Sequence, residues 1–191
     1  MAIDLASLLV AGVRDGKILE QPIPPATELE VVNFEKRIGH DLPADYRRFL
    51  LTINGGMVNR NITKNVTYNV VPMLGGSEAG SFETTLGYMF TLYPNWTELL
   101  EAKRDQNILT LNVSYIYYED LEGAGFPFPP PDCVPIASAA ADNGYLLLVL
   151  AGNHKNKVLY YDYSLYPDEV YGNVWVAANS FSEFVGSLRT E

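Results

Sequence analysis

Residues 34–56 read FEKRIGHDLPADYRRFLLTINGG. A helical pattern runs up to Gly39, and a second helix is predicted to begin at Leu42-Pro43, because proline is tolerated in the first turn of a helix. Asn54-Gly55-Gly56 then ends this second helix in residues that accept a left-handed backbone. The stretch therefore predicts two consecutive helices followed by a sharp change in chain direction.

The sequence before this stretch carries its own helix signals. Thr27 and Glu30 form a capping box, which predicts a helix over residues 27–38. Leucine and valine at helical spacing predict a short helix over residues 4–13. Residues 18–25 are interpreted as an extended connector, because their three prolines cannot lie inside a helix.

The sequence after residue 56 predicts mainly strands. Residues 145–150 are a continuous apolar run, typical of a strand buried on both faces. A helix capped by Asn95 is predicted at 96–105, and a capping box from Ser180 to Glu183 begins a final helix. The whole pattern predicts a single α+β domain in which helices flank a mainly antiparallel or mixed sheet. The other predicted strands are 59–73, 107–118, 134–137, 157–162 and 174–177.

Composition restricts the class of protein. The chain has 191 residues, of which 48% are hydrophobic, so one packed domain is expected. Cys133 is the only cysteine and there are two histidines, which excludes a disulfide framework and argues against a zinc site. The N-terminus lacks the basic region of a signal peptide, and no apolar run reaches the ~18 residues that a membrane span needs. We therefore expect a cytoplasmic protein without a metal.

Net charge is −10, and it is unevenly distributed. Residues 1–104 carry 10 basic and 12 acidic residues, whereas residues 105–191 carry 3 and 11. An acidic surface repels nucleic-acid phosphates and attracts basic protein surfaces, although it also serves solubility alone. The charge therefore favours a basic protein partner over DNA or RNA, and no membrane partner is expected.

The stretch at 34–56 resembles the signature of the SUKH superfamily, which includes fungal Smi/Knr-type regulators of cell-wall synthesis and bacterial immunity proteins of toxin systems. The resemblance covers residues 27–189, and residues 1–26 precede it as the predicted helix and connector. It implies one domain of helices around a sheet, no cofactor, no catalysis, and a protein-binding surface. Its pieces here are Gly39-His40-Asp41-Leu42-Pro43, Tyr46-Arg47-Arg48-Phe49-Leu50 and Asn54-Gly55-Gly56.

Two positions depart from the family pattern. Members often carry an acid after the Pro-Ile-Ala segment and another after the turn glycine, where this chain has Ser138-Ala139 and Tyr145. The signature residues themselves are interpreted as structural: Tyr46 and Phe49 are expected in the core. They indicate the fold and not the binding site.

The candidate binding site combines aromatic and acidic residues. Tyrosine offers rigid contact area with a polar tip, and carboxylates attract a basic partner. The alternative is that these tyrosines are strand residues packed half in the core. The candidate partner-binding residues are Tyr117, Tyr118, Glu119, Asp120, Glu122, Asp162, Tyr166, Asp168 and Glu169.

Three functions remain open from the sequence. The first hypothesis is an immunity protein that binds and neutralises a toxin, for example a basic nuclease. The second is a regulatory or scaffolding interaction module. The third is a hydrolase that uses paired acids such as Glu119 with Glu122, which we interpret instead as solvated charge. Cys133 and His154 are interpreted as a structural thiol and an exposed turn residue, so no catalytic residue is assigned.

Overall fold

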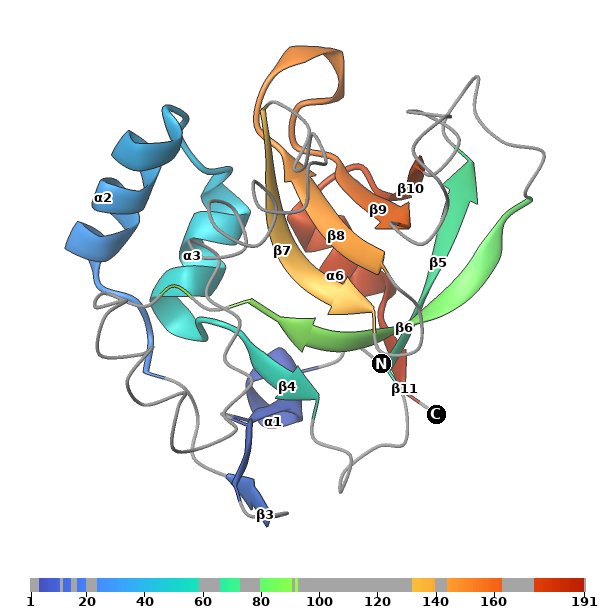
Figure 1. Ribbon diagram of the computed structural model, residues 1–191, viewed down its shortest axis with the longest axis horizontal. Coiled ribbons are helices and arrows are strands. Elements are labelled where there is room, and N and C mark those ends of the chain that lie inside the picture. The colour runs from blue at the N-terminus through green and yellow to red at the C-terminus, as the bar shows by residue number, and fades with distance from the viewer. Residues whose placement is uncertain are drawn as a thin grey trace.

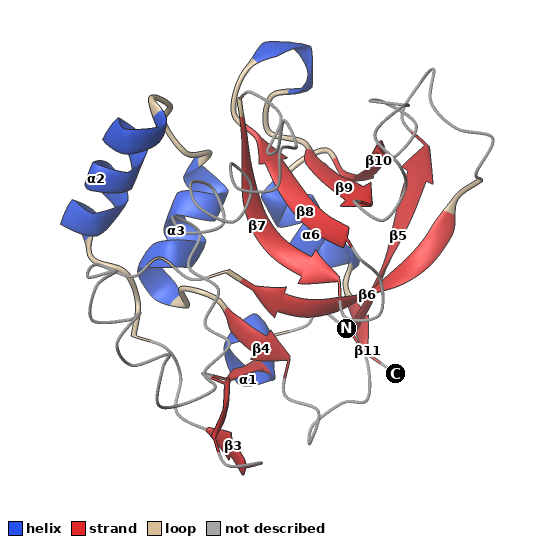
Figure 2. Ribbon diagram, in the orientation of Figure 1, coloured by secondary structure: helices blue, strands red, loops and turns tan. Residues whose placement is uncertain are grey.

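The computed structural model describes residues 4–10, 12–14, 17–19, 24–58, 66–72, 80–90, 92, 132–139, 144–162 and 174–190 (Figure 1). The architecture is α+β, as predicted, with helices beside a large curved sheet (Figure 2). The helices are α1 (Leu5–Leu8), α2 (Glu28–Ile38), α3 (Ala44–Thr52) and α6 (Phe181–Ser187), with a 3-10 turn η1 (Gly152–His154). The strands are β1 (Leu9–Val10), β2 (Gly12–Arg14), β3 (Lys17–Leu19), β4 (Gly56–Val58), β5 (Val66–Pro72), β6 (Phe82–Met89), β7 (Cys133–Ala139), β8 (Gly144–Val149), β9 (Val158–Asp162), β10 (Val174–Ala178) and β11 (Arg189–Thr190).

Six of the strands close into an antiparallel barrel. The neighbours follow the order β6-β7-β8-β9-β10-β5, and β5 pairs again with β6. Closure removes free sheet edges within the ring. β4 and then β1 extend the sheet from β6, β11 lies on β5, and β2 and β3 form a separate two-stranded sheet.

Strand β6 joins the barrel to its extension because it changes neighbours along its length. Its first half, Phe82 to Thr85, pairs with β5. Its second half, from Leu86, pairs with β7, and Tyr88 also pairs with Met57 of β4. The register with β7 shifts between Leu86 and Tyr88, and such a bulge bends a strand.

Strand β8 is buried on both faces, as its apolar sequence predicted. Leu146 and Leu148 belong to the main core, which also contains the buried residues of the four helices in the described part of the chain. Leu147 and Val149 belong to a second apolar cluster on the opposite face of the sheet. The described helices therefore cover one face of this strand, and the second cluster consists of residues from β7 to β10.

The two predicted helices of the signature form as expected. Thr27 caps α2, with its hydroxyl accepting from the Glu30 N–H and the Glu30 carboxylate accepting from the Thr27 N–H at 2.6 Å. Gly39 ends the helix in a left-handed conformation, with φ of 73°. Arg47 of α3 donates to Glu28 and Glu35 of α2, at 2.6 and 3.3 Å, which holds the two helices together.

Aromatic side chains join α3 to α6. The rings of Tyr46 and Phe181 meet edge to face, with centroids 4.9 Å apart, and Phe49 lies 5.1 Å from Phe181. Asp45 adds a polar link, because its carboxylate accepts a hydrogen bond of 2.8 Å from the Ser182 N–H in the first turn of α6. Tyr46 and Phe49 are thus core residues, which confirms the structural interpretation of the signature.

The N-terminal prediction was wrong in extent. The helix ends at Leu8, and Leu9–Val10 turns into a strand that pairs antiparallel with β4. Pairing of Leu9 with Val58 supplies an edge partner to β4, and the β-branched Val10 favours strand over helix. Within the expected connector, Ile18 also lies in a strand, opposite Val13.

The capping box predicted at Ser180 is only half formed. The Ser180 hydroxyl accepts from the Glu183 N–H at 3.0 Å, as expected. The Glu183 carboxylate instead accepts from the backbone and side-chain N–H groups of Asn179, one residue earlier. The helix predicted at 96–105 and the strand predicted at 107–118 lie outside the described residues. No helix in the described part is long and apolar enough to cross a membrane.

Candidate functional site

Five side chains form a row across five neighbouring strands, from β4 to β9. Met57 is the cross-strand partner of Tyr88, and Tyr88 is the partner of Ser138. Ser138 in turn lies opposite Tyr145, and Tyr145 lies opposite Tyr161. Directly opposed residues share a face of a sheet. We call these five residues the tyrosine row.

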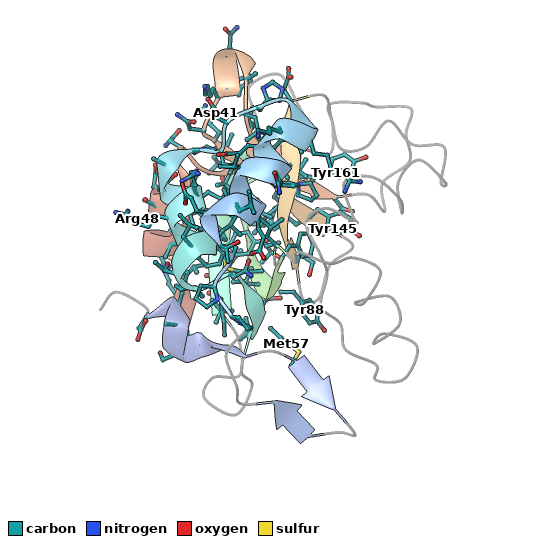
Figure 3. The ribbon with its side chains drawn as sticks, turned by 90° about the vertical axis from the view of Figure 1, so that its left-hand side faces the viewer. Asp41, Arg48, Met57, Tyr88, Tyr145 and Tyr161 are labelled. Carbon is teal, nitrogen blue, oxygen red and sulfur yellow. The ribbon has the colours of Figure 1, made fainter. Side chains whose placement is uncertain are left out.

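The row lies on the outer face of the sheet. The residues next to it, such as Met89 and Leu146, alternate to the other face and are fully buried in the main core. All five row residues are instead partly exposed. In Figure 3, Met57, Tyr88, Tyr145 and Tyr161 follow one another along one side of the molecule, while Arg48 lies on the opposite side.

The centre of the row is Ser138, whose hydroxyl oxygen is buried and has no hydrogen-bond partner within the described ranges. The ring of Tyr145 lies near that of Phe90, the residue directly after β6. Their centroids are 6.0 Å apart and the interplanar angle is 57°. Ser138-Ala139 and Tyr145 are also the two places where the sequence is expected to depart from the family pattern of acids. The fold therefore places both departures side by side, in the middle of the row.

An acidic group lies at the β9 end of the row. Burial, and then the negative charge of the neighbouring Asp162, raises the pKa of the Tyr161 phenol. Tyr161 is therefore a neutral hydroxyl at physiological pH, able to donate and accept hydrogen bonds. Asp162 itself ends β9 and is the cross-strand partner of Gly144.

Asp162 is the one candidate binding residue from the sequence that falls within the described residues, and it lies beside the row. The rest of that set lies outside them: Tyr117, Tyr118, Glu119, Asp120, Glu122, Tyr166, Asp168 and Glu169. Sequence reasoning did not single out Met57 or Tyr88, and it named Ser138 only as a departure from the family pattern. The period-two alternation of β6 and β7 was a signal for their face, but only the strand order could bring them together.

The described residues include Cys133, His40 and His154, the cysteine and the two histidines of the sequence. Burial, and then the charge of Asp132, raises the pKa of Cys133 to about 11, so its thiol is protonated at neutral pH and is a poor nucleophile. His40 contacts Asp132, with 2.9 Å between Nε2 and Oδ1. His154 is exposed in η1, as predicted. Within the described ranges, no three His, Cys, Asp or Glu side chains gather to hold a metal ion.

Comparison with known proteins found one matching family model and no matching curated protein. The model of the SMI1/KNR4 family (SUKH-1) matches residues 25–187, which include α2, α3, the whole barrel and α6. This match covers most of the chain and confirms the resemblance seen in the signature. The chain belongs to the SMI1/KNR4 family (SUKH-1).

Proposed function

We propose that this chain is a non-catalytic protein-binding domain that binds and neutralises a toxin, and that the tyrosine row is part of its binding surface. The observation that carries the proposal is the continuity of the row. Three tyrosines and a methionine lie on one face across strands β4 to β9, and all are partly exposed. Such side chains dominate the energetics of many protein interfaces.

The strands under the row make it a rigid surface. β8 pairs with β7 from Tyr145 to Val149 and with β9 from Gly144 to Leu148, and its reverse face is the main core. A rigid surface loses little conformational entropy on binding, so more of the contact energy appears as affinity. Tyrosines add only two rotatable side-chain bonds each, which lowers that loss further.

Charge indicates the chemistry of the partner. The chain carries a net charge of −10, and Asp162, which follows Tyr161 in β9, lies close enough for its charge to act on the Tyr161 phenol. Electrostatic attraction would accelerate association with a basic protein and fix its orientation. A basic toxin, for example a nuclease that binds nucleic-acid phosphates, fits this requirement. A regulatory or scaffolding partner would use the same surface, and the experiment below separates the two.

The test uses the protein encoded beside the gene for this chain in its native genome. That protein is expressed alone and together with the chain, and cell growth is measured. The expected result is arrest of growth by the neighbour alone, rescue by the chain, and a stoichiometric complex of the two purified proteins. Rescue through binding requires no turnover, so an excess of toxin over the chain should restore arrest.

Variants locate the binding surface. Tyr88→Ala and Tyr161→Ala remove two rings of the row and should weaken the complex at least about tenfold each. Arg48→Ala, on the opposite side of the molecule, is the matched control and should bind like wild type. Circular dichroism melting curves check that each variant is folded. If the row variants bind the partner as tightly as wild type, the tyrosine row is not the binding surface. A complex that forms without any effect on growth would favour the regulatory function.

A further inference from the structure

The turn after α3 contains a chemically labile pair, Asn54 followed by Gly55. An asparagine side chain can react with the backbone nitrogen of the next residue, and glycine favours this reaction because it has no Cβ to shield that nitrogen. The sequence has two Asn-Gly pairs, and the other is Asn143 with Gly144. Asn143 lies outside the described residues, whereas Asn54 and Gly55 are both buried. The fold therefore controls access to the Asn54-Gly55 pair.

The reaction is a deamidation in two steps. The Gly55 backbone nitrogen gives its proton to water and bonds to the Asn54 Cγ, and the side-chain nitrogen leaves as ammonia. Water then opens the resulting five-membered ring at one of its two carbonyl carbons. Opening at Cγ gives aspartate. Opening at the backbone carbonyl gives isoaspartate, in which the main chain runs through Cβ and Cγ of residue 54. Water is thus the co-reactant.

The fold fixes the Asn54 amide with three hydrogen bonds. Its nitrogen donates to the carbonyls of Pro24 and Leu92 at 3.0 and 2.9 Å, and its oxygen accepts from the Leu92 N–H at 2.8 Å. Attack makes Cγ tetrahedral and expels the nitrogen, so both hydrogen bonds of that nitrogen are lost. Asn54 is 3% exposed, which also keeps water from the reacting atoms. The folded state therefore opposes both steps.

The attacking residue is held in place as well. A Cβ at position 55 would lie 2.6 Å from the carbonyl oxygens of Met89 and Phe90, so the Gly55 backbone packs directly on the end of β6. A shift of the Gly55 nitrogen toward the Asn54 Cγ would disturb this contact. Unfolding removes this packing and the hydrogen bonds of Asn54 together.

The products do not fit the folded site. In aspartate, a carboxylate oxygen replaces the amide nitrogen and faces the carbonyl oxygens of Pro24 and Leu92, with which it cannot form hydrogen bonds. The Leu92 N–H would be the one remaining donor of the three hydrogen bonds at this side chain. A buried carboxylate that lacks donors is strongly unfavourable. Isoaspartate adds a carbon atom to the main chain directly before the close contact at Gly55.

We propose that Asn54 is a deamidation site that the fold protects and unfolding exposes, and that deamidation at Asn54 makes unfolding irreversible. The folded chain opens rarely, so it reacts in proportion to the small population of the open form. A chain modified while it is unfolded is removed from the refolding equilibrium. Anything that binds only the folded chain lowers the open population and slows this loss. The inference is independent of the tyrosine row.

The test compares the full chain in native buffer with the same chain in guanidinium chloride, at one pH and temperature. Samples are digested with trypsin at intervals, and fragment mass spectra give the deamidated fraction at each asparagine. Trypsin cuts after Arg48 and Arg60, so Asn54 and Asn143 lie in different peptides. In guanidinium chloride both should react at similar rates. In native buffer Asn54 should react at least about a hundredfold more slowly than in guanidinium chloride.

Refolding measures the consequence of the reaction. Chains incubated in guanidinium chloride are returned to native buffer, and size-exclusion chromatography separates native from misfolded chains. Modification at Asn54 should be at least about tenfold rarer in the native fraction than in the misfolded one. Asn54→Asp, which is one of the products, should not enter the native fraction. Asn33→Asp makes the same chemical change on the exposed face of α2 and should refold like wild type.

Two results would overturn the proposal. One is deamidation of Asn54 at equal rates in native buffer and in guanidinium chloride, since the fold would then give no protection. The other is a native fraction in which Asn54 is modified as often as in the whole sample, since the products would then fit the folded site.

Discussion

Asn54 and Leu92 are joined by two reciprocal hydrogen bonds. The Asn54 side-chain amide donates to the Leu92 carbonyl at 2.9 Å, and the Leu92 N–H donates to the Asn54 amide oxygen at 2.8 Å. The same amide nitrogen also donates to the Pro24 carbonyl at 3.0 Å. The asparagine of the family signature therefore ties the end of α3 to two distant backbone segments.

Asn54→Ala should destabilise the protein strongly. It leaves two buried backbone groups at Leu92 without partners, and each such group costs about 1–3 kcal/mol. A non-glycine, non-asparagine residue is also strained at the φ of 62° found here. We expect a loss of about 3–5 kcal/mol in the free energy of unfolding, measured by urea denaturation. Asn33→Ala, on the exposed face of α2, should change it by less than about 0.5 kcal/mol.

Gly55→Ala should be as damaging for a different reason. A Cβ at position 55 would lie 2.6 Å from the carbonyl oxygens of Met89 and Phe90, and these are backbone atoms that cannot move aside cheaply. The φ of 88° adds strain for any side chain. Gly186→Ala is the matched control, because the space around it is open and it lies in α6. Gly186→Ala should melt at the same temperature as wild type or a higher one. Equal melting temperatures for Gly55→Ala and Gly186→Ala would contradict the close approach of residue 55 to the Met89 and Phe90 carbonyl oxygens.

The sequence predicted those parts of the fold that depend on local signals. The Thr27 capping box, the Gly39 helix end and the doubly buried strand at 145–150 all form as expected, because neighbouring residues determine them. Strand β6 was not predicted, although Phe82, Thr84 and Leu86 alternate inward, because its threonines and Gly87 weaken the apolar pattern. Glu183 was assigned the wrong partner, because its carboxylate accepts from the Asn179 N–H, one residue before the expected Ser180 N–H.

The candidate site was less accessible to sequence reasoning than the fold. Clusters of tyrosines and acids along the chain indicated Asp162, which follows Tyr161 of the row in β9 and whose role in binding stays a prediction. Tyr88 and Tyr145 are far apart in sequence and are brought close only because β7 pairs with both β6 and β8. Strand order depends on the packing of the whole core, which no local pattern encodes.

Tyr46→Phe should leave stability unchanged or raise it by up to about 1 kcal/mol. The Tyr46 hydroxyl is buried, and within the described residues it has no hydrogen-bond partner. Burial raises the pKa of this phenol, so the hydroxyl stays protonated and its removal eliminates only an unsatisfied polar group. Tyr46→Ala should instead cost about 3–5 kcal/mol, since it also removes the ring that packs on Phe181. A loss above about 2 kcal/mol for Tyr46→Phe would show that the hydroxyl is bonded in solution.

Cys133 should make stability fall at alkaline pH. Burial, and then the charge of Asp132, raises its pKa from 9.0 to about 11 in the folded protein. The folded state thus retains a proton that the unfolded state releases, so the contribution is fully present below pH 9.0 and is lost as pH rises to about 11. Its size is about 2–3 kcal/mol.

Other groups titrate in the same range, so the measured quantity is the difference in unfolding free energy between wild type and Cys133→Ala. This difference should shrink between pH 9 and 11, and a thiol reagent at pH 8 should label the unfolded chain but not the folded one. Rapid labelling of the folded protein would mean that the thiol is neither buried nor raised in pKa.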